Sequence, residues 1–212
     1  MRIQKEVALA LALVLALVAA PVPDAHATTM LPQNLVDLVS LSEHIVVGDV
    51  IDLSDGFDAQ GVPYTEITVR IDESIHGSSG STLTFRQFGL LEARTLPDGS
   101  RYLGVTPPGW PEFRVDEEVM LFVHEGSRAT GLKTTVGLLQ GKFSIRDGRI
   151  SNGVANRNVF HHVDLDPSML SARQAKAVQD PSTMEAEAFI DLVRTVVKER
   201  WVEEGRLSHA QH

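Results

Sequence analysis

The chain has 212 residues, no cysteine, 43% apolar residues and a formal net charge of −9. These values fit one ordinary globular domain, and they exclude a disulfide scaffold and a cysteine-ligated zinc or iron–sulfur site. The acidic balance also weighs against nucleic acid as a partner, because Lys and Arg contacts to phosphates dominate that affinity.

The first 27 residues have the layout of a secretory signal peptide. A basic start precedes an unbroken apolar run over residues 7–20, and Ala25-His26-Ala27 supplies the small residues that a signal peptidase accepts. We therefore predict cleavage between Ala27 and Thr28. The run is shorter than the roughly 20 apolar residues of a membrane span, and no cysteine stands at the cleavage point to carry a lipid anchor. The sequence thus predicts an exported protein, periplasmic or extracellular, with neither a span nor a lipid anchor after cleavage.

A short helix and three strands are predicted next. Residues 32–43 place apolar side chains on one face at helical spacing. Residues 44–53 are β-branched and apolar, which is typical of a buried strand. Residues 64–75 alternate between apolar and polar side chains, and residues 82–88 follow a turn rich in Gly and Ser. These patterns predict antiparallel strands.

Residues 89–117 form a long stretch rich in proline and glycine. Loops of this length are uncommon in compact domains and are usually functional or disordered. Further strands are predicted over residues 119–124 and 132–140. Two more flank Asp147-Gly148, because this dipeptide is typical of a two-residue hairpin turn.

A long amphipathic helix is predicted near the C-terminus. Ser182 and Glu185 have the spacing of a capping box, and Gly205 follows the last apolar position. The apolar side chains between them share one wide face that indicates contact with a core: Phe189, Leu192, Val193, Val196, Val197 and Trp201.

The order of these elements predicts a mainly β protein. We expect a small antiparallel OB-like barrel of five or six strands, with the short N-terminal helix and the long C-terminal helix packed outside it, because closure removes exposed strand edges. A β-sandwich is the alternative. The predicted division is a signal peptide at 1–27, a barrel domain at 28–165 with the long loop 89–117, and a helical segment with tail at 166–212.

Three segments carry a resemblance to known proteins: HIVVGDV at 44–50, ITVRIDESIHG at 67–77 and VDEEVMLF at 115–122. In sequence and order they resemble a family of uncharacterised exported bacterial proteins, whose layout is similar to the netrin-like module of tissue inhibitors of metalloproteinases. The resemblance covers roughly residues 35–145 and implies an OB fold with two helices outside the barrel. It does not carry over the inhibitory mechanism, because those inhibitors chelate zinc through an N-terminal cysteine and this chain has none.

The candidate binding surface is the long loop with polar residues near it. Tyr and Trp are enriched at interaction hot spots, and the loop holds three aromatic residues. The alternative is that these aromatic side chains fill one end of the barrel. The candidate binding residues are Arg86, Gln87, Tyr102, Trp110, Phe113 and Gln140.

The candidate metal ligands are His161, Asp164 and Asp166, since imidazole and carboxylate groups bind zinc. Adjacent histidines on a strand point to opposite faces, so only one of His161 and His162 can join the aspartates. Asp166 followed by proline is also typical of a helix start. These features make a metal site the weaker interpretation, and no cofactor is predicted.

Other charged residues have ordinary interpretations. The carboxylates at 117–118 are interpreted as solvated strand ends. The basic residues of the predicted strands are interpreted as solvent-facing positions, not as a nucleic-acid surface: Arg86, Lys133, Lys142, Arg146 and Arg149.

The sequence therefore predicts an exported, non-enzymatic binding module whose partner is another protein or an envelope component. No nucleophile elbow, phosphate loop or dinucleotide fingerprint is present. One alternative is a metal-dependent or other hydrolase of the cell envelope, and a third possibility is a cysteine-free proteinase inhibitor. The ligand, the oligomeric state and the choice between periplasm and medium are not fixed by the sequence.

Overall fold

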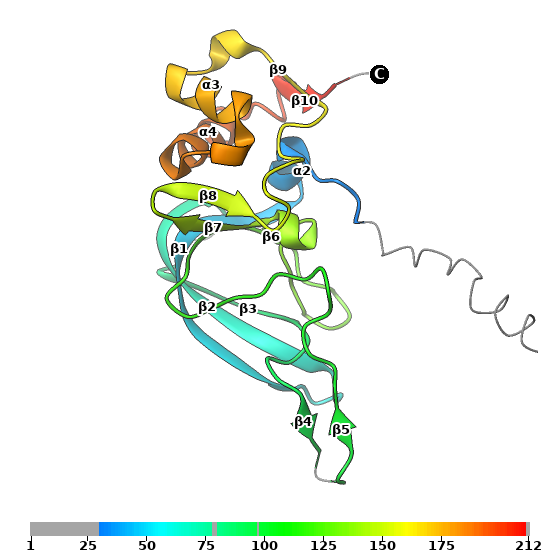
Figure 1. Cartoon of the computed structure of the whole chain (residues 1–212). Coiled ribbons are helices and arrows are strands. Elements are labelled where there is room, and N and C mark those ends of the chain that lie inside the picture. Colours follow the sequence, from blue (N-terminus) through cyan, green and yellow to red (C-terminus); the bar gives the residue numbers. More distant parts are fainter. Residues whose placement is uncertain (1–29, 78–79, 97, 211–212) are drawn as a thin grey trace, which may run out of the picture. The chain divides into compact units, whose positions relative to one another are not determined.

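The computed structural model describes residues 30–77, 80–96 and 98–210, so the predicted signal peptide and its cleavage point lie outside the described residues. The chain is mainly β, as predicted. Its main element is a six-stranded antiparallel sheet with the strand order β3-β2-β1-β6-β7-β8 (Figure 1).

The sheet consists of β1 (Ser42–Phe57), β2 (Pro63–His76), β3 (Thr82–Phe88), β6 (Glu118–His124), β7 (Lys142–Arg146) and β8 (Arg149–Asn152). Two small two-stranded sheets are made by β4 (Arg94–Thr95) with β5 (Arg101–Tyr102), and by β9 (Val163–Leu165) with β10 (Leu207–His209). The helices are α2 (Leu35–Ser40), α3 (Ala172–Gln179) and α4 (Ala186–Lys198), with the short 3₁₀ turns η1 (Leu138–Gln140), η2 (Pro167–Met169) and η3 (Pro181–Thr183).

The long strand β1 connects the two halves of the sheet. It pairs with β2 along most of its length and with β6 over its first half only. The register with β2 shifts at three places, and one shift lies between Val47 and Gly48. Such bulges bend a strand, and Figure 1 shows β1 curving as it leaves the neighbourhood of β6.

Both faces of the central strands are buried. On β1, Ile45 and Val47 belong to one apolar core, while Val46 and Val50 belong to a second. Because successive side chains of a strand point to opposite faces, a strand covered on both sides has a continuous apolar sequence. This explains the apolar part of the run over residues 45–50.

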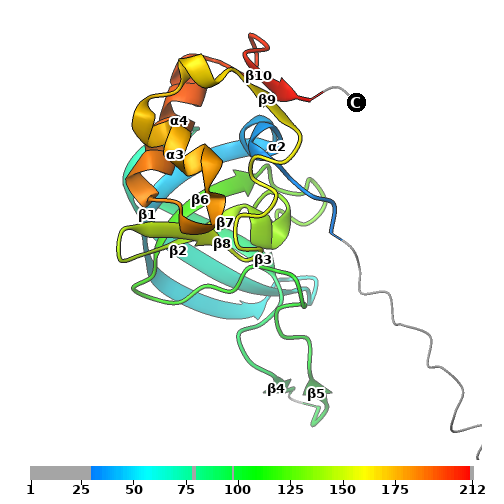
Figure 2. The same ribbon diagram turned by 45° about the horizontal axis from the view of Figure 1, so that its top comes forward.

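The helices cover one face of the sheet. Figures 1 and 2 place α3 and α4 on the same side, beyond β7 and β8. Phe189 of α4 lies 5.0 Å from Phe143 of β7, measured between ring centroids. The second core lies between β1, β2, β3 and β6 and contains Phe113 of the long loop. The helical segment and the sheet thus share the first core.

The sheet is not closed into a barrel, so that prediction is wrong. Among the described strands, β3 and β8 stand at opposite ends of the order and do not pair with each other. Other segments contact both edge strands: Ile150 N–H donates to Met184 C=O over 3.1 Å, and Lys133 N–H donates to Arg86 C=O over 2.7 Å. These contacts protect part of each edge without closure.

Two local predictions are also corrected. Residues 132–140 do not form a strand: only Thr135 makes a bridge, to Val123, and Gly137 has a positive φ of 61° before η1. The predicted capping box is absent, because Glu185 makes no side-chain capping bond and Ser182 Oγ donates to Asp180 instead. Within the described part of the chain, no helix is long and apolar enough to cross a membrane.

Candidate functional site

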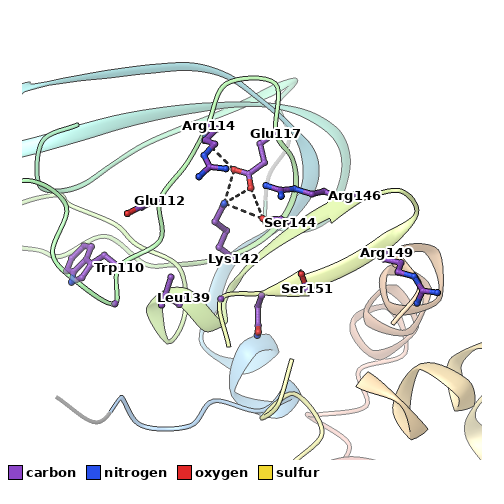
Figure 3. Close-up of a pocket in the computed structure, with 13 residues that line it drawn as sticks. Trp110, Glu112, Arg114, Glu117, Leu139, Lys142, Ser144, Arg146, Arg149 and Ser151 are labelled. Atoms are coloured by element: carbon purple, nitrogen blue, oxygen red, sulfur yellow. Dashed lines mark hydrogen bonds and ion pairs between the residues drawn. The ribbon is translucent and has the colours of Figure 1, made fainter. Parts of the chain in front are cut away.

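A cleft of about 470 Å³ opens between β7 and the segment that leads into β6 (Figure 3). The long loop contributes Trp110, Glu112, Arg114 and Glu117, and η1 contributes Leu139. Alternation along β7 supplies the other wall: Phe143 and Ile145 face the first core, so Lys142, Ser144 and Arg146 face the cleft.

A buried ion pair forms the floor of the cleft. Lys142 Nζ lies 2.7 Å from Glu117 Oε1 and 2.8 Å from Glu117 Oε2. The two side chains are only 10% and 8% exposed, respectively. Ser144 Oγ donates to Glu117 Oε1 over 2.6 Å, and the backbone N–H of Arg114 donates to Oε2 over 3.3 Å. The carboxylate is therefore fully engaged by donors.

Burial and the partner's charge shift the pKa of each residue of the pair in opposite directions. Burial raises the pKa of Glu117, but the bonds from Lys142 and Ser144 outweigh this and leave the pKa below its ordinary value. Burial also lowers the pKa of Lys142, and the Glu117 carboxylate opposes this shift only in part. The pair is thus internally neutral and already desolvated.

Two arginines flank this pair. Figure 3 shows Arg114 and Arg146 on either side of Glu117, and both cations lower the pKa of Lys142 by repulsion. Among the residues that the structure describes, no carboxylate forms an ion pair with either guanidinium. Arg149 also lines the cleft, but its Nη1 donates to Thr183 C=O over 2.6 Å.

A second, acidic hollow adjoins the cleft and shares Arg114, Glu117 and Arg146 with it. Its other charged residues are Asp49, Asp116 and Glu118. Burial and then the neighbouring carboxylates raise the pKa of Glu118, whereas Asp49 is paired with Arg70. The two arginines therefore stand on the boundary between a cationic cleft and an acidic hollow.

No family model, curated protein or solved structure matches this chain. The interpretation of the cleft therefore depends on its own geometry and charge.

The predicted aromatic residues of the long loop have separate positions. Trp110 lines the cleft and packs on Phe88, with 6.2 Å between ring centroids. Phe113 is buried in the second core, and Lys142 Nζ lies 5.1 Å from its ring centroid. Tyr102 packs edge-on against Phe57 at 5.3 Å and is not part of the cleft lining. The loop thus contributes both to the core and to the cleft.

The three predicted polar residues are also separated. Arg86 donates to Glu66 over 2.6 Å and lies over the ring of Tyr64. Gln140 is buried and holds the segment before α2, since its Oε1 accepts from Gln33 N–H and its Nε2 donates to Leu31 C=O. Gln87 is buried beside a different pocket.

Each of the three candidate metal ligands makes separate contacts. Asp166 Oδ1 accepts from Ser168 N–H over 2.8 Å and caps η2. Asp164 lies on β9 opposite Ser208, and the ring of His161 stacks edge-on with that of His162. Within residues 30–77, 80–96 and 98–210, no three His, Asp or Glu side chains are grouped to hold a metal ion.

The sequence interpretation missed the main residues of the cleft. Glu117 was expected to be a solvated strand end, and Lys142 and Arg146 were expected to face solvent. The alternation of Lys142 and Ser144 with two apolar residues was visible in the sequence. It did not identify Glu117 as the partner, because pairing of β6 with β7 brings the two segments together.

Proposed function

We propose that this protein is an exported binding module that holds an anionic ligand in the cleft beside β7 and does not transform it. The observation that carries the proposal is the placement of Arg114 and Arg146 on both sides of an internally neutral Lys142–Glu117 pair. Export is proposed from the layout of the first 27 residues.

Charge supports an anionic ligand. The chain as a whole carries a net charge of −9, yet the cleft lining has four cations against two carboxylates, Glu112 and Glu117. Guanidinium groups present a planar fork of donors that fits carboxylate and phosphate groups. Trp110 and Leu139 add an apolar wall against which the uncharged part of such a ligand can pack.

The polar contacts support binding without reaction. A lysine acting as a general base must be uncharged. Burial lowers the pKa of Lys142, but the Glu117 carboxylate opposes this shift and accepts from Nζ over 2.7 and 2.8 Å, so the lysine nitrogen is already engaged. Ser144 Oγ is 3.5 Å from Lys142 Nζ and donates a hydrogen bond to Glu117. The serine and the lysine are therefore arranged to hold the carboxylate.

The proposal predicts a measurable affinity for small anions. Isothermal titration of the purified protein with inorganic phosphate and with citrate is expected to give saturable binding that weakens as salt rises, because surface charge is screened. Arg146→Gln is expected to weaken it about tenfold, in the range of one charge-assisted hydrogen bond. The matched control is Arg128→Gln, which removes an exposed cation that is not in the cleft lining. Equal loss in both variants, or no saturable binding, contradicts the proposal.

The two alternative functions, a hydrolase and a proteinase inhibitor, predict different experimental results. A metal-dependent hydrolase predicts stoichiometric zinc in the purified protein that His161→Ala removes. A proteinase inhibitor predicts that the protein lowers the activity of envelope proteases. We also propose that the chain resembles the netrin-like module in the order of its strands and helices. An antiparallel sheet with helices on one face is compatible with this proposal.

A further inference from the structure

A second pocket of about 330 Å³ lies at the end of β3, beside the cleft. Residues at its boundary include Leu91, Val105 and Phe113, which make it more apolar than the cleft. Leu91 and Val105 are large apolar side chains that remain 44% and 43% exposed. Glu112 lines both pockets.

One buried polar atom in this pocket has no partner. Gln87 follows the alternation of β3, so its side chain points inward with those of Leu83 and Phe85 and is only 1% exposed. Gln87 Nε2 donates to Pro111 C=O over 3.0 Å, which fixes the orientation of the amide. Gln87 Oε1 accepts no hydrogen bond from any described residue.

A buried acceptor without a donor is costly, and such groups in native proteins are nearly always satisfied. Thr65, which lies opposite Gln87 in the pairing of β2 with β3, does not fill this role, because its Oγ1 donates to Gly89 C=O over 2.9 Å. The lining therefore combines three apolar side chains and the fixed acceptor of Gln87 with Thr65, Thr106 and Glu112. A matching ligand packs its apolar part on the first three and supplies a donor to Gln87.

We infer that this pocket binds an apolar ring that donates a single hydrogen bond, from O–H or N–H, to Gln87 Oε1. Phe113, Leu91 and Val105 contact the apolar part of the ring. The site differs from the cleft in chemistry, and it stands whether or not the cleft binds an anion.

The test compares phenol with toluene, two rings of similar size of which only phenol has a donor. Titration of the isotope-labelled protein followed by nuclear magnetic resonance is expected to show about tenfold tighter binding of phenol, since the unpaired acceptor gains its partner. Gln87→Met removes the acceptor and is expected to abolish the preference while retaining affinity for toluene. Gln60→Met, the same change at an exposed turn position, is expected to leave the preference intact.

A variant at the boundary of the pocket tests the apolar contact separately from the hydrogen bond to Gln87. Leu91→Ser is expected to weaken phenol and toluene equally, because it removes apolar contact and leaves Gln87 in place. The inference is overturned if the wild-type protein binds the two rings equally or binds neither. It is also overturned if the preference for phenol persists in Gln87→Met, because that preference then comes from another group. If Gln87→Met does not fold, contacts between phenol protons and the methyl groups of Leu91 and Val105 decide the matter, and their absence overturns it.

Discussion

Lys142→Met is expected to lower the free energy of unfolding by about 2–4 kcal/mol at pH 7, because it leaves the carboxylate of Glu117 buried without its cation. Both partners are at most one-tenth exposed in their side chains. The measurement is urea denaturation monitored by circular dichroism. The double variant Lys142→Met/Glu117→Gln is expected to recover much of the loss, since it removes the unpaired charge as well.

The same variant is expected to change the response to pH. In the wild type the pKa of Glu117 lies below its ordinary value of 4.5, so its contribution to stability is present above that pH and is lost as pH falls through the folded-state pKa. In Lys142→Met, burial acts without the cation and raises the pKa, so protonation stabilises the variant. The difference in stability between the two proteins is therefore expected to narrow between pH 7 and pH 4.

An exposed ion pair provides the control. Lys176 and Glu185 are 75% and 44% exposed in their side chains, and exposed pairs contribute little. Lys176→Met is expected to change the free energy of unfolding by no more than about 0.5 kcal/mol. A loss in Lys142→Met as small as this, or one independent of pH, contradicts the view that the pair is buried and coupled.

Gly48→Ala is expected to destabilise the protein by about 3 kcal/mol or more, because a methyl group has no room there. A Cβ at Gly48 lies 1.9 Å from the carbonyl oxygen of Arg70 and 2.9 Å from its carbon, both backbone atoms of the paired strand. The bulge between Val47 and Gly48 creates this close approach. Urea denaturation measures the loss.

The matched control for this prediction is Gly80→Ala. Its nearest non-neighbouring atom is Thr82 C=O at 3.5 Å, an ordinary contact distance. We expect a change within about 0.5 kcal/mol, as for most surface substitutions. Similar stabilities of Gly48→Ala and Gly80→Ala would mean that β1 and β2 can separate locally without cost.

Local sequence patterns predicted those parts of the fold that neighbouring residues control. The Asp147-Gly148 hairpin is confirmed, since both residues have positive φ and Arg146 pairs with Arg149. Four of the apolar side chains predicted on one face of the C-terminal helix are buried in α4, which ends at Lys198, and Trp201 is buried beyond that end. The strand expected over residues 132–140 is absent: Thr135 makes one isolated bridge, and Gly137 has a positive φ before η1.

The cleft was harder to predict, because its residues come from segments whose contact depends on strand pairing. Trp110 was identified from residue type alone and does line the cleft. Glu117 and Lys142 are 25 positions apart, and each has an ordinary solvent-facing interpretation when taken alone. Gln87 was selected as a polar residue near the loop, but its unsatisfied oxygen is visible only once β3 and Pro111 are placed together.

The conformational preferences and spacing of adjacent residues are enough to predict the β-rich character of the chain, the alternation of its strands, the tight hairpin and the apolar face of α4. Long-range packing sets the remaining features: the sheet stays open, residues 133 and 184 contact its edge strands, and Arg114 and Arg146 flank one buried ion pair. The physical reason is that burial and Coulomb interactions depend on distance in space, and pairing of β6 with β7 sets those distances.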